Sequence, residues 1–334
     1  MFQSWSQCPD SKVRIPCVSR KSVDNLWQVT AKSGLRRGAA RRSVFELASV
    51  VSVYDNKPAR LLTQLAPLTE ANPRSGAFCA GFEVKKWRCD ALATHLVEWI
   101  ADYALIEEEL RVTHTTMYGR LREAAVRIYT SEKYKSRGEA GEIALHAICR
   151  DYFDTIPIAP RVFYLTASND VVKSFDMVHV RHVAGDSFEI WLGESKLYEK
   201  SSDAMTDAIA SVSAHIDQGF LNREKLLLGP QISKSVPHYQ QIRDLLSNQS
   251  SLDEVFKAAV FPALIAAESP AVSSHEEHSP EYISAAGAEL QKLAARIAKS
   301  GLHQKIEIVL IYLPLCSKQD LVKAFDEKLK GITA

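Results

Sequence analysis

Two apolar segments near the middle of the chain have the composition of β-strands. They cover residues 174–180 and 188–198, and both are rich in β-branched and aromatic residues. Gly185-Asp186 stands between them as a turn signal, so the two segments together predict a β-hairpin.

Charged residues stand inside both of these predicted strands. Asp176 lies in the first strand, and Glu194 and Lys196 lie in the second. Burial of an ionised group is costly unless a partner group or a metal ion compensates its charge. Three charged groups on adjoining strands therefore indicate a functional site.

The periodicity of the remaining chain predicts helices and further strands around the hairpin. Apolar residues recur at helical spacing in six segments: 90–99, 116–133, 137–150, 201–216, 281–297 and 317–329. Apolar runs typical of strands occur at 77–84, 161–166, 260–267 and 305–313. Pro262 cannot donate a ladder hydrogen bond, which predicts a sheet edge or a bulge for its strand. The order of elements predicts an α/β fold with a mixed central sheet flanked by helices.

The same patterns divide the chain into three parts. Residues 1–74 alternate basic clusters with short apolar runs, and they are predicted to be a basic extension of unknown role. Two interpretations of this extension stay open, an arm that touches nucleic acid or an appendage outside the chemistry. Residues 75–136 are predicted to form a mainly helical subdomain, and residues 137–334 are predicted to form the core that carries the hairpin.

Composition and charge exclude some classes of protein. The 334 residues are 46% hydrophobic and 24% charged, which is typical of a globular protein and excludes disorder throughout. The net charge of +1 predicts no partner, although residues 1–80 hold 12 Lys/Arg against 5 Asp/Glu. Six cysteines without a CxxC pair indicate a reducing compartment. Without a membrane span or secretory signal, we expect a cytoplasmic protein.

The tripeptide Glu194-Ser195-Lys196 suggests the chemistry of the site. Side chains alternate along a strand with a period of two, so Glu194 and Lys196 share one face and Ser195 points to the other. The carboxylates of Asp176 and Glu194 are hard ligands that suit Mg²⁺ or Mn²⁺ and leave coordinated waters for a phosphate substrate. A lysine beside such a metal can orient or help deprotonate an attacking water and can stabilise charge on phosphate oxygens.

The helix predicted near 137–150 carries two further carboxylates. Glu139 and Glu142 are three residues apart, close to the positive N-terminal end of the helix. They either complement the helix dipole, or Glu142 points at the site from the border of the buried face. The sequence leaves open whether Glu139 or Glu142 is the residue that faces the site. His179 and His215 are interpreted as structural histidines.

Three motifs, taken in this order, resemble the PD-(D/E)xK nuclease superfamily: Gly141-Glu142, Ser174-Phe175-Asp176 and Gly193-Glu194-Ser195-Lys196. The core of that superfamily is a helix, a three-stranded meander, a helix and a further strand. The flanking segments at 176–179, 192–198 and 311–315 are similar to HamA, the family of nuclease subunits of Hachiman anti-phage defence systems. The resemblance extends from about residue 77 to the end, and it makes 137–334 a PD-(D/E)xK-like nuclease core.

This resemblance implies a DNase that depends on Mg²⁺ or Mn²⁺ and has little sequence specificity. Its implied partners are DNA and a helicase subunit (HamB), which holds the nuclease inactive until it meets abnormal or invading DNA. By position, Asp176, Glu194 and the backbone carbonyl of Ser195 would bind the metal. Lys196 would act on the water, and Glu142 would bind metal or water from the helix.

Two other functions remain open. A non-catalytic subunit would use the helices to bind a partner, with the acidic residues merely paired to Lys196 and to arginines. Wide separation of the Asp176 and Glu194 carboxylates, or a closed site capped by Lys196, would favour that interpretation. A sequence-specific restriction endonuclease would instead yield discrete DNA fragments.

Overall fold

The computed structural model describes residues 52–129, 138–158 and 175–334, apart from 184, 186 and 235. The predicted strand at 161–166 and most of the basic extension lie outside the described residues. The contacts divide the chain after Ser52, and Val53–Ala334 is a compact unit that is described here by itself.

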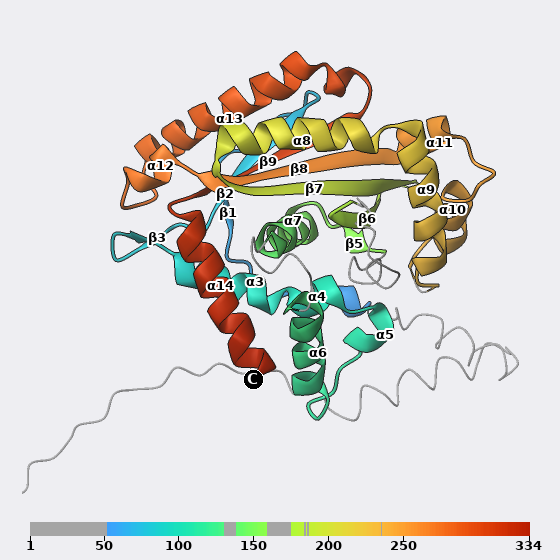
Figure 1. The fold of residues 1–334 in the computed structure, drawn as a ribbon, viewed down its shortest axis with the longest axis horizontal. Helices are drawn as coiled ribbons and strands as arrows, with labels where there is room; N and C mark the ends of the chain where they lie inside the picture. The colour runs from blue at the N-terminus through green and yellow to red at the C-terminus, as the bar shows by residue number, and fades with distance from the viewer. Residues whose placement is uncertain (1–51, 130–137, 159–174, 184, 186, 235) are drawn as a thin grey trace, which may run out of the picture. The chain divides into compact units, whose positions relative to one another are not determined.

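A seven-stranded mixed sheet runs through this unit (Figure 1). Its order is β1-β2-β9-β8-β7-β6-β5, and β3 and β4 form a separate hairpin. The strands are β1 (Thr63–Gln64), β2 (Arg74–Cys79), β3 (Phe82–Glu83), β4 (Lys86–Trp87), β5 (Ile156–Pro157), β6 (Met177–His182), β7 (Phe188–Lys200), β8 (Ala259–Glu268) and β9 (Glu307–Leu315). The strands β2, β9, β8 and β7 run parallel to one another, whereas β1, β6 and β5 pair antiparallel. The predicted α/β class with a mixed sheet is therefore confirmed.

Helices cover both faces of the sheet (Figure 1). Those described are α3 (Cys89–Glu98), α4 (Ile100–Ala104), α5 (Glu107–Leu110), α6 (Met117–Tyr129), α7 (Glu139–Tyr152), α8 (Ser201–His215), α9 (Gln218–Leu228), α10 (Tyr239–Leu245), α11 (Leu252–Ala258), α12 (Pro270–Ser273), α13 (Pro280–Ser300) and α14 (Lys318–Thr333), with short 3-10 turns η1 (Val53–Asp55), η4 (Gly229–Gln231) and η5 (Leu302–Gln304). No helix among the described residues is long and apolar enough to cross a membrane.

The core consists of two hydrophobic clusters, one on each face of the sheet. One cluster joins alternate strand residues such as Ile190 and Leu192 to α8 and α13. The other joins the intervening residues, such as Trp191, to α3, α7 and α14. Because both faces are covered, the central strands are apolar almost throughout, as expected for strands buried on both sides.

The hairpin predicted at the centre of the chain is present. β6 and β7 pair antiparallel from Met177 opposite Gly193 to His182 opposite Phe188. Gly185, in the turn, has a φ of 76°, a conformation that glycine adopts without steric cost.

The predicted position of Pro262 at an edge or a bulge is wrong. Pro262 lies in β8, which is a central strand between β9 and β7. Its ladder with β9 is continuous through Val309, but the recorded register with β7 omits Leu192 and Gly193, which lie opposite Phe261 and Pro262. A local gap in one ladder thus accommodates the missing N–H group.

Candidate functional site

The backbone of the β6–β7 hairpin places Asp176 beside the Glu194-Ser195-Lys196 segment. Asp176 immediately precedes β6, and its N–H donates to the carbonyl of Gly193 at 2.9 Å. In return, the N–H of Ser195 donates to Asp176 Oδ2, also at 2.9 Å. The Asp176 side chain is buried. These two hydrogen bonds fix its carboxylate next to the backbone between Glu194 and Lys196.

Glu194 and Lys196 form a close ion pair within β7. Lys196 Nζ lies 2.6 Å from Glu194 Oε1, and the two side chains are 17% and 6% exposed. Burial alone would lower the pKa of Lys196, but the charge and hydrogen bond of Glu194, with Asp176 further away, outweigh it and raise this pKa. Lys196 is therefore a stable cation at neutral pH, suited to orient a water or stabilise negative charge.

Ser195 points to the opposite face of the sheet, against α7. A Cβ atom added to Gly141 of α7 would lie 2.7 Å from Ser195 Oγ and 3.1 Å from Leu197 Cβ. This close approach explains why a glycine stands at position 141. It also shows that α7 packs on one face of β7 and that Glu194 and Lys196 lie on the other, as the strand period predicts.

His215, at the last position of α8, reaches Glu194. Its Nδ1 atom lies 3.4 Å from Glu194 Oε2, and both side chains are 6% exposed. The interpretation of His215 as structural missed this contact. No sequence pattern indicates this contact, because it joins residues 21 positions apart and depends on how α8 packs on β7.

Glu142 occupies a different position from the hairpin carboxylates. It is buried in α7, and its Oε2 accepts a hydrogen bond from the Tyr103 hydroxyl of α4 at 2.7 Å. Its neighbour Glu139 is also buried. The role of Glu142 as a metal or water ligand stays a prediction, and so does the choice between Glu139 and Glu142.

The two hairpin carboxylates form an oxygen donor set suited to a small divalent cation. In the part of the chain that the structure describes, no three Asp, Glu, His or Cys side chains converge as a ready metal cage. Mg²⁺ does not require such a cage, because it usually binds through one or two carboxylates and keeps several waters. Asp176 and Glu194, with the backbone carbonyl of Ser195 between them in the chain, therefore fit this ion by ligand chemistry.

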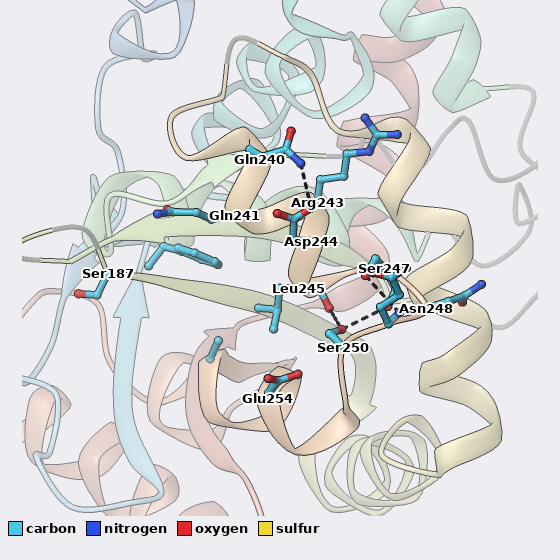
Figure 2. Close-up of a pocket in the computed structure, with 13 residues that line it drawn as sticks. Ser187, Gln240, Gln241, Arg243, Asp244, Leu245, Ser247, Asn248, Ser250 and Glu254 are labelled. Carbon is cyan, nitrogen blue, oxygen red and sulfur yellow. Dashed lines mark hydrogen bonds between the residues drawn. The ribbon is translucent and has the colours of Figure 1, made fainter.

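A polar hollow opens elsewhere, at the start of β7. It has a volume of about 1150 Å³ and is lined by β7, α10, α11 and the loop between these helices. Figure 2 shows its amide and hydroxyl groups, including Gln240 hydrogen-bonded to Asp244. Phe188 in its lining is six residues from Glu194, or about 20 Å at the rise of a strand. The hollow is thus separate from the acidic site.

A buried hydrogen-bond network holds α7 against α4 and β6. His146 Nε2 pairs with Asp102 Oδ1 at 2.7 Å, and His146 Nδ1 pairs with His179 Nε2 at 3.0 Å. The other ring nitrogen of His179 pairs with the Thr155 hydroxyl at 2.7 Å. The interpretation of His179 as a buried structural histidine is confirmed.

Arg150 completes this network at the far end of α7. Its guanidinium contacts Asp102 at 3.0 Å and donates to the Thr155 carbonyl at 2.7 Å. Burial would raise the pKa of Asp102, but His146 and Arg150 hold it below its usual value. Arg150 also donates to the carbonyl of Tyr54 in η1, so the network connects η1 to α7.

Fold and site together define an α/β protein whose mixed sheet carries an acidic pair and a lysine at the β6–β7 hairpin. A family model described as HamA matches residues 59–329, so the chain belongs to the HamA family. HamA proteins are components of Hachiman anti-phage defence systems. No curated protein and no solved structure matches the chain.

Proposed function

We propose that this HamA-family protein is a metal-dependent deoxyribonuclease, with Mg²⁺ or Mn²⁺ as its cofactor and a helicase subunit as its controlling partner. The observation that carries the proposal is that the β6–β7 hairpin brings Asp176, directly before β6, together with Glu194 and Lys196 of β7. All three side chains are at most 17% exposed, and Lys196 is paired with Glu194 at 2.6 Å, so they are not a solvated surface cluster.

The order of elements supports a PD-(D/E)xK core. α7, the antiparallel strands β5, β6 and β7, then α8 and the parallel strand β8 follow one another along the chain, with α9 to α11 inserted before β8. This is the helix, meander, helix and strand that the resemblance implies.

The residues of the site have distinct roles in the proposed hydrolysis. Asp176 and Glu194 would hold the cation, with the Ser195 carbonyl as a third oxygen. A bound Mg²⁺ would act as a Lewis acid on the scissile phosphate and lower the pKa of a coordinated water. Lys196, kept cationic by Glu194, would orient the attacking water and stabilise charge on the phosphate oxygens. Glu142 would contribute from α7 if its carboxylate reaches the same ion.

Plasmid degradation tests the nuclease assignment. The full chain is incubated with plasmid DNA and Mg²⁺, beside the Glu194→Ala/Lys196→Ala double variant. Arg181→Ala/Glu189→Ala is a matched control, because this pair forms a 3.3 Å ion pair on the same hairpin. We expect the wild type and the control to degrade DNA, and the site variant to be inactive.

The same assay with the co-purified helicase present separates the alternatives. A repressed nuclease would be silent in the complex and active once abnormal DNA engages the helicase. Equal degradation by wild type and site variant, or inactivity of the wild type both alone and in the stimulated complex, would refute the nuclease. Discrete fragments instead of a smear would favour a restriction endonuclease.

Affinity purification from the native host tests the partner. A tagged chain expressed from its own operon is expected to co-purify with a helicase. Retrieval of the chain without a helicase, under conditions that preserve the complex, would contradict the proposed control.

A further inference from the structure

We infer that His215 is a positioning residue for Glu194, with the hydrogen on Nδ1 directed at Glu194 Oε2. The hydrogen-bond assignment is independent of the reaction, whereas its consequence for metal binding rests on the proposed function. His215 therefore extends the site from two strands to the helix that follows them.

The two oxygens of Glu194 face different groups. Oε1 lies 2.6 Å from Lys196 Nζ, and Oε2 lies 3.4 Å from His215 Nδ1. Oε2 is buried and accepts no hydrogen bond from the described residues. An ionised carboxylate oxygen in that position is strongly unfavourable unless a donor satisfies it.

Two phenylalanines fix the orientation of the His215 ring. Its centroid lies 4.5 Å from that of Phe220, stacked at 21°, and 4.7 Å from that of Phe175, tilted at 64°. Phe175 directly precedes Asp176 in the sequence. The imidazole therefore packs on the segment of one site carboxylate while Nδ1 faces the other.

The tautomer follows from the chemistry of the facing atoms. A carboxylate can only accept hydrogen bonds, and an Nδ1 without hydrogen would place its lone pair against those of Oε2. An Nδ1–H group removes this repulsion and satisfies the buried oxygen, and a shift of a few tenths of an ångström closes the pair to hydrogen-bond distance. With Oε2 held by His215, Oε1 remains on the side of Lys196, where the metal and water are proposed to bind.

The first test reads the tautomer directly. Long-range ¹H–¹⁵N NMR of the full-length protein at neutral pH distinguishes a hydrogen-bearing Nδ1 from a bare one, and the His215→Asn spectrum assigns the signal. We expect the hydrogen on Nδ1. A bare Nδ1 with the hydrogen on Nε2 alone overturns the inference, whether or not the protein is a nuclease.

The second test measures Mn²⁺ affinity by EPR, with the metal alone as the probe. His215→Phe keeps a ring between Phe175 and Phe220 but removes the N–H, and His215→Asn places an amide nitrogen near the position of Nδ1. Loss of an outer hydrogen bond to a metal ligand typically weakens binding by about 10- to 100-fold. We expect this loss in His215→Phe and partial recovery in His215→Asn.

The outcomes separate the two levels of the argument. Wild-type affinity in His215→Phe overturns the positioning role, because packing alone would then suffice. Glu194→Gln serves as the site control: if it binds Mn²⁺ as tightly as the wild type, or if the wild type binds no Mn²⁺, the proposed metal site fails. The NMR result then decides the hydrogen bond between His215 and Glu194 by itself. Thermal unfolding of each variant confirms that the fold is retained.

Discussion

Three buried histidines predict that the protein loses stability steeply below pH 6.5. Burial lowers the pKa of His95 to about 4. Burial also lowers the pKa of His146, although Asp102 opposes it, and lowers that of His179 well below its usual value. All three side chains are at most 2% exposed, so each is neutral in the folded protein at neutral pH.

The hydrogen-bond network requires a neutral ring at His146. An ionised Asp102 only accepts, so His146 donates to it from Nε2 and must accept at Nδ1 from His179 Nε2. The Thr155 hydroxyl then donates to His179 Nδ1. A proton added to His146 Nδ1 would face the N–H of His179, so two donors would oppose each other. For His179, burial and the nearby His146 and Arg150 disfavour the charged ring and lower its pKa.

The sign and size of the effect follow from proton linkage. The folded pKa of each ring lies below the unfolded value of about 6.5, so the unfolded chain binds more protons as the pH falls through that range. His95, whose folded pKa is about 4, then removes about 1 kcal/mol of unfolding free energy between about pH 6 and pH 5. His146 and His179 act in the same direction, because burial lowers the pKa of each ring. Even the loss from His95 alone is a measurable share of a typical total of about 5–15 kcal/mol.

Urea unfolding at about pH 7, 6 and 5 measures this loss. His95→Gln keeps an acceptor for Trp99 Nε1, which lies 3.2 Å from His95 Nε2, and is expected to reduce the slope between pH 6 and pH 5 by about 1 kcal/mol per pH unit. A free energy of unfolding that stays constant from pH 6.5 to pH 5, or an unchanged slope in His95→Gln, would show that these rings are not held neutral by the fold.

Three further substitutions test the packing in unfolding experiments. Gly141→Ala is expected to destabilise the protein by about 1–3 kcal/mol, because the added Cβ would lie 2.7 Å from Ser195 Oγ of β7. The control Gly287→Ala in α13, where the added Cβ meets open space, should stabilise it by up to about 1 kcal/mol. Equal effects of the two substitutions would contradict the close contact at Gly141. Val84→Asn should stabilise by about 1 kcal/mol, because Val84 is 88% exposed at a φ of 48°, and a loss of stability would refute this strain. Arg150→Met should cost about 3–5 kcal/mol by leaving Asp102 buried without its cation, and a cost below about 1 kcal/mol would show that the charge is compensated elsewhere.

Local pattern was sufficient for most of the elements that carry the site. The β6–β7 hairpin, the helix after it and the shared face of Glu194 and Lys196 follow from periods of two and 3.6, which depend only on neighbouring residues. Strand order did not follow, because β9 lies between β2 and β8 although it is the last strand in sequence. Such pairing depends on contacts across more than 200 residues, which periodicity does not encode.

The polar contacts of the site were invisible for a related reason. Tyr103, Asp102 and His215 each reach the site or its supporting helix from an element distant in sequence. In each case the residue type permits many roles, and only the packing of two elements selects one. His215 is an example: a histidine near a helix end commonly stabilises the helix dipole, and its contact with Glu194 arises from the position of α8 across β7.

The position of Glu142 shows how far a motif can place a side chain. A helix turns by about 100° per residue, so the contact of Gly141 with β7 turns Glu142 away from the sheet and toward the flank. His146, one turn later, lies on the same flank and contacts both α4 and β6. Glu142 therefore contacts α4, whereas Glu194 and Lys196 lie on the face of β7 that α8 covers. The motif therefore identifies the helix that carries Glu142, whereas the packing of α7 on α4 sets the contact that its carboxylate makes.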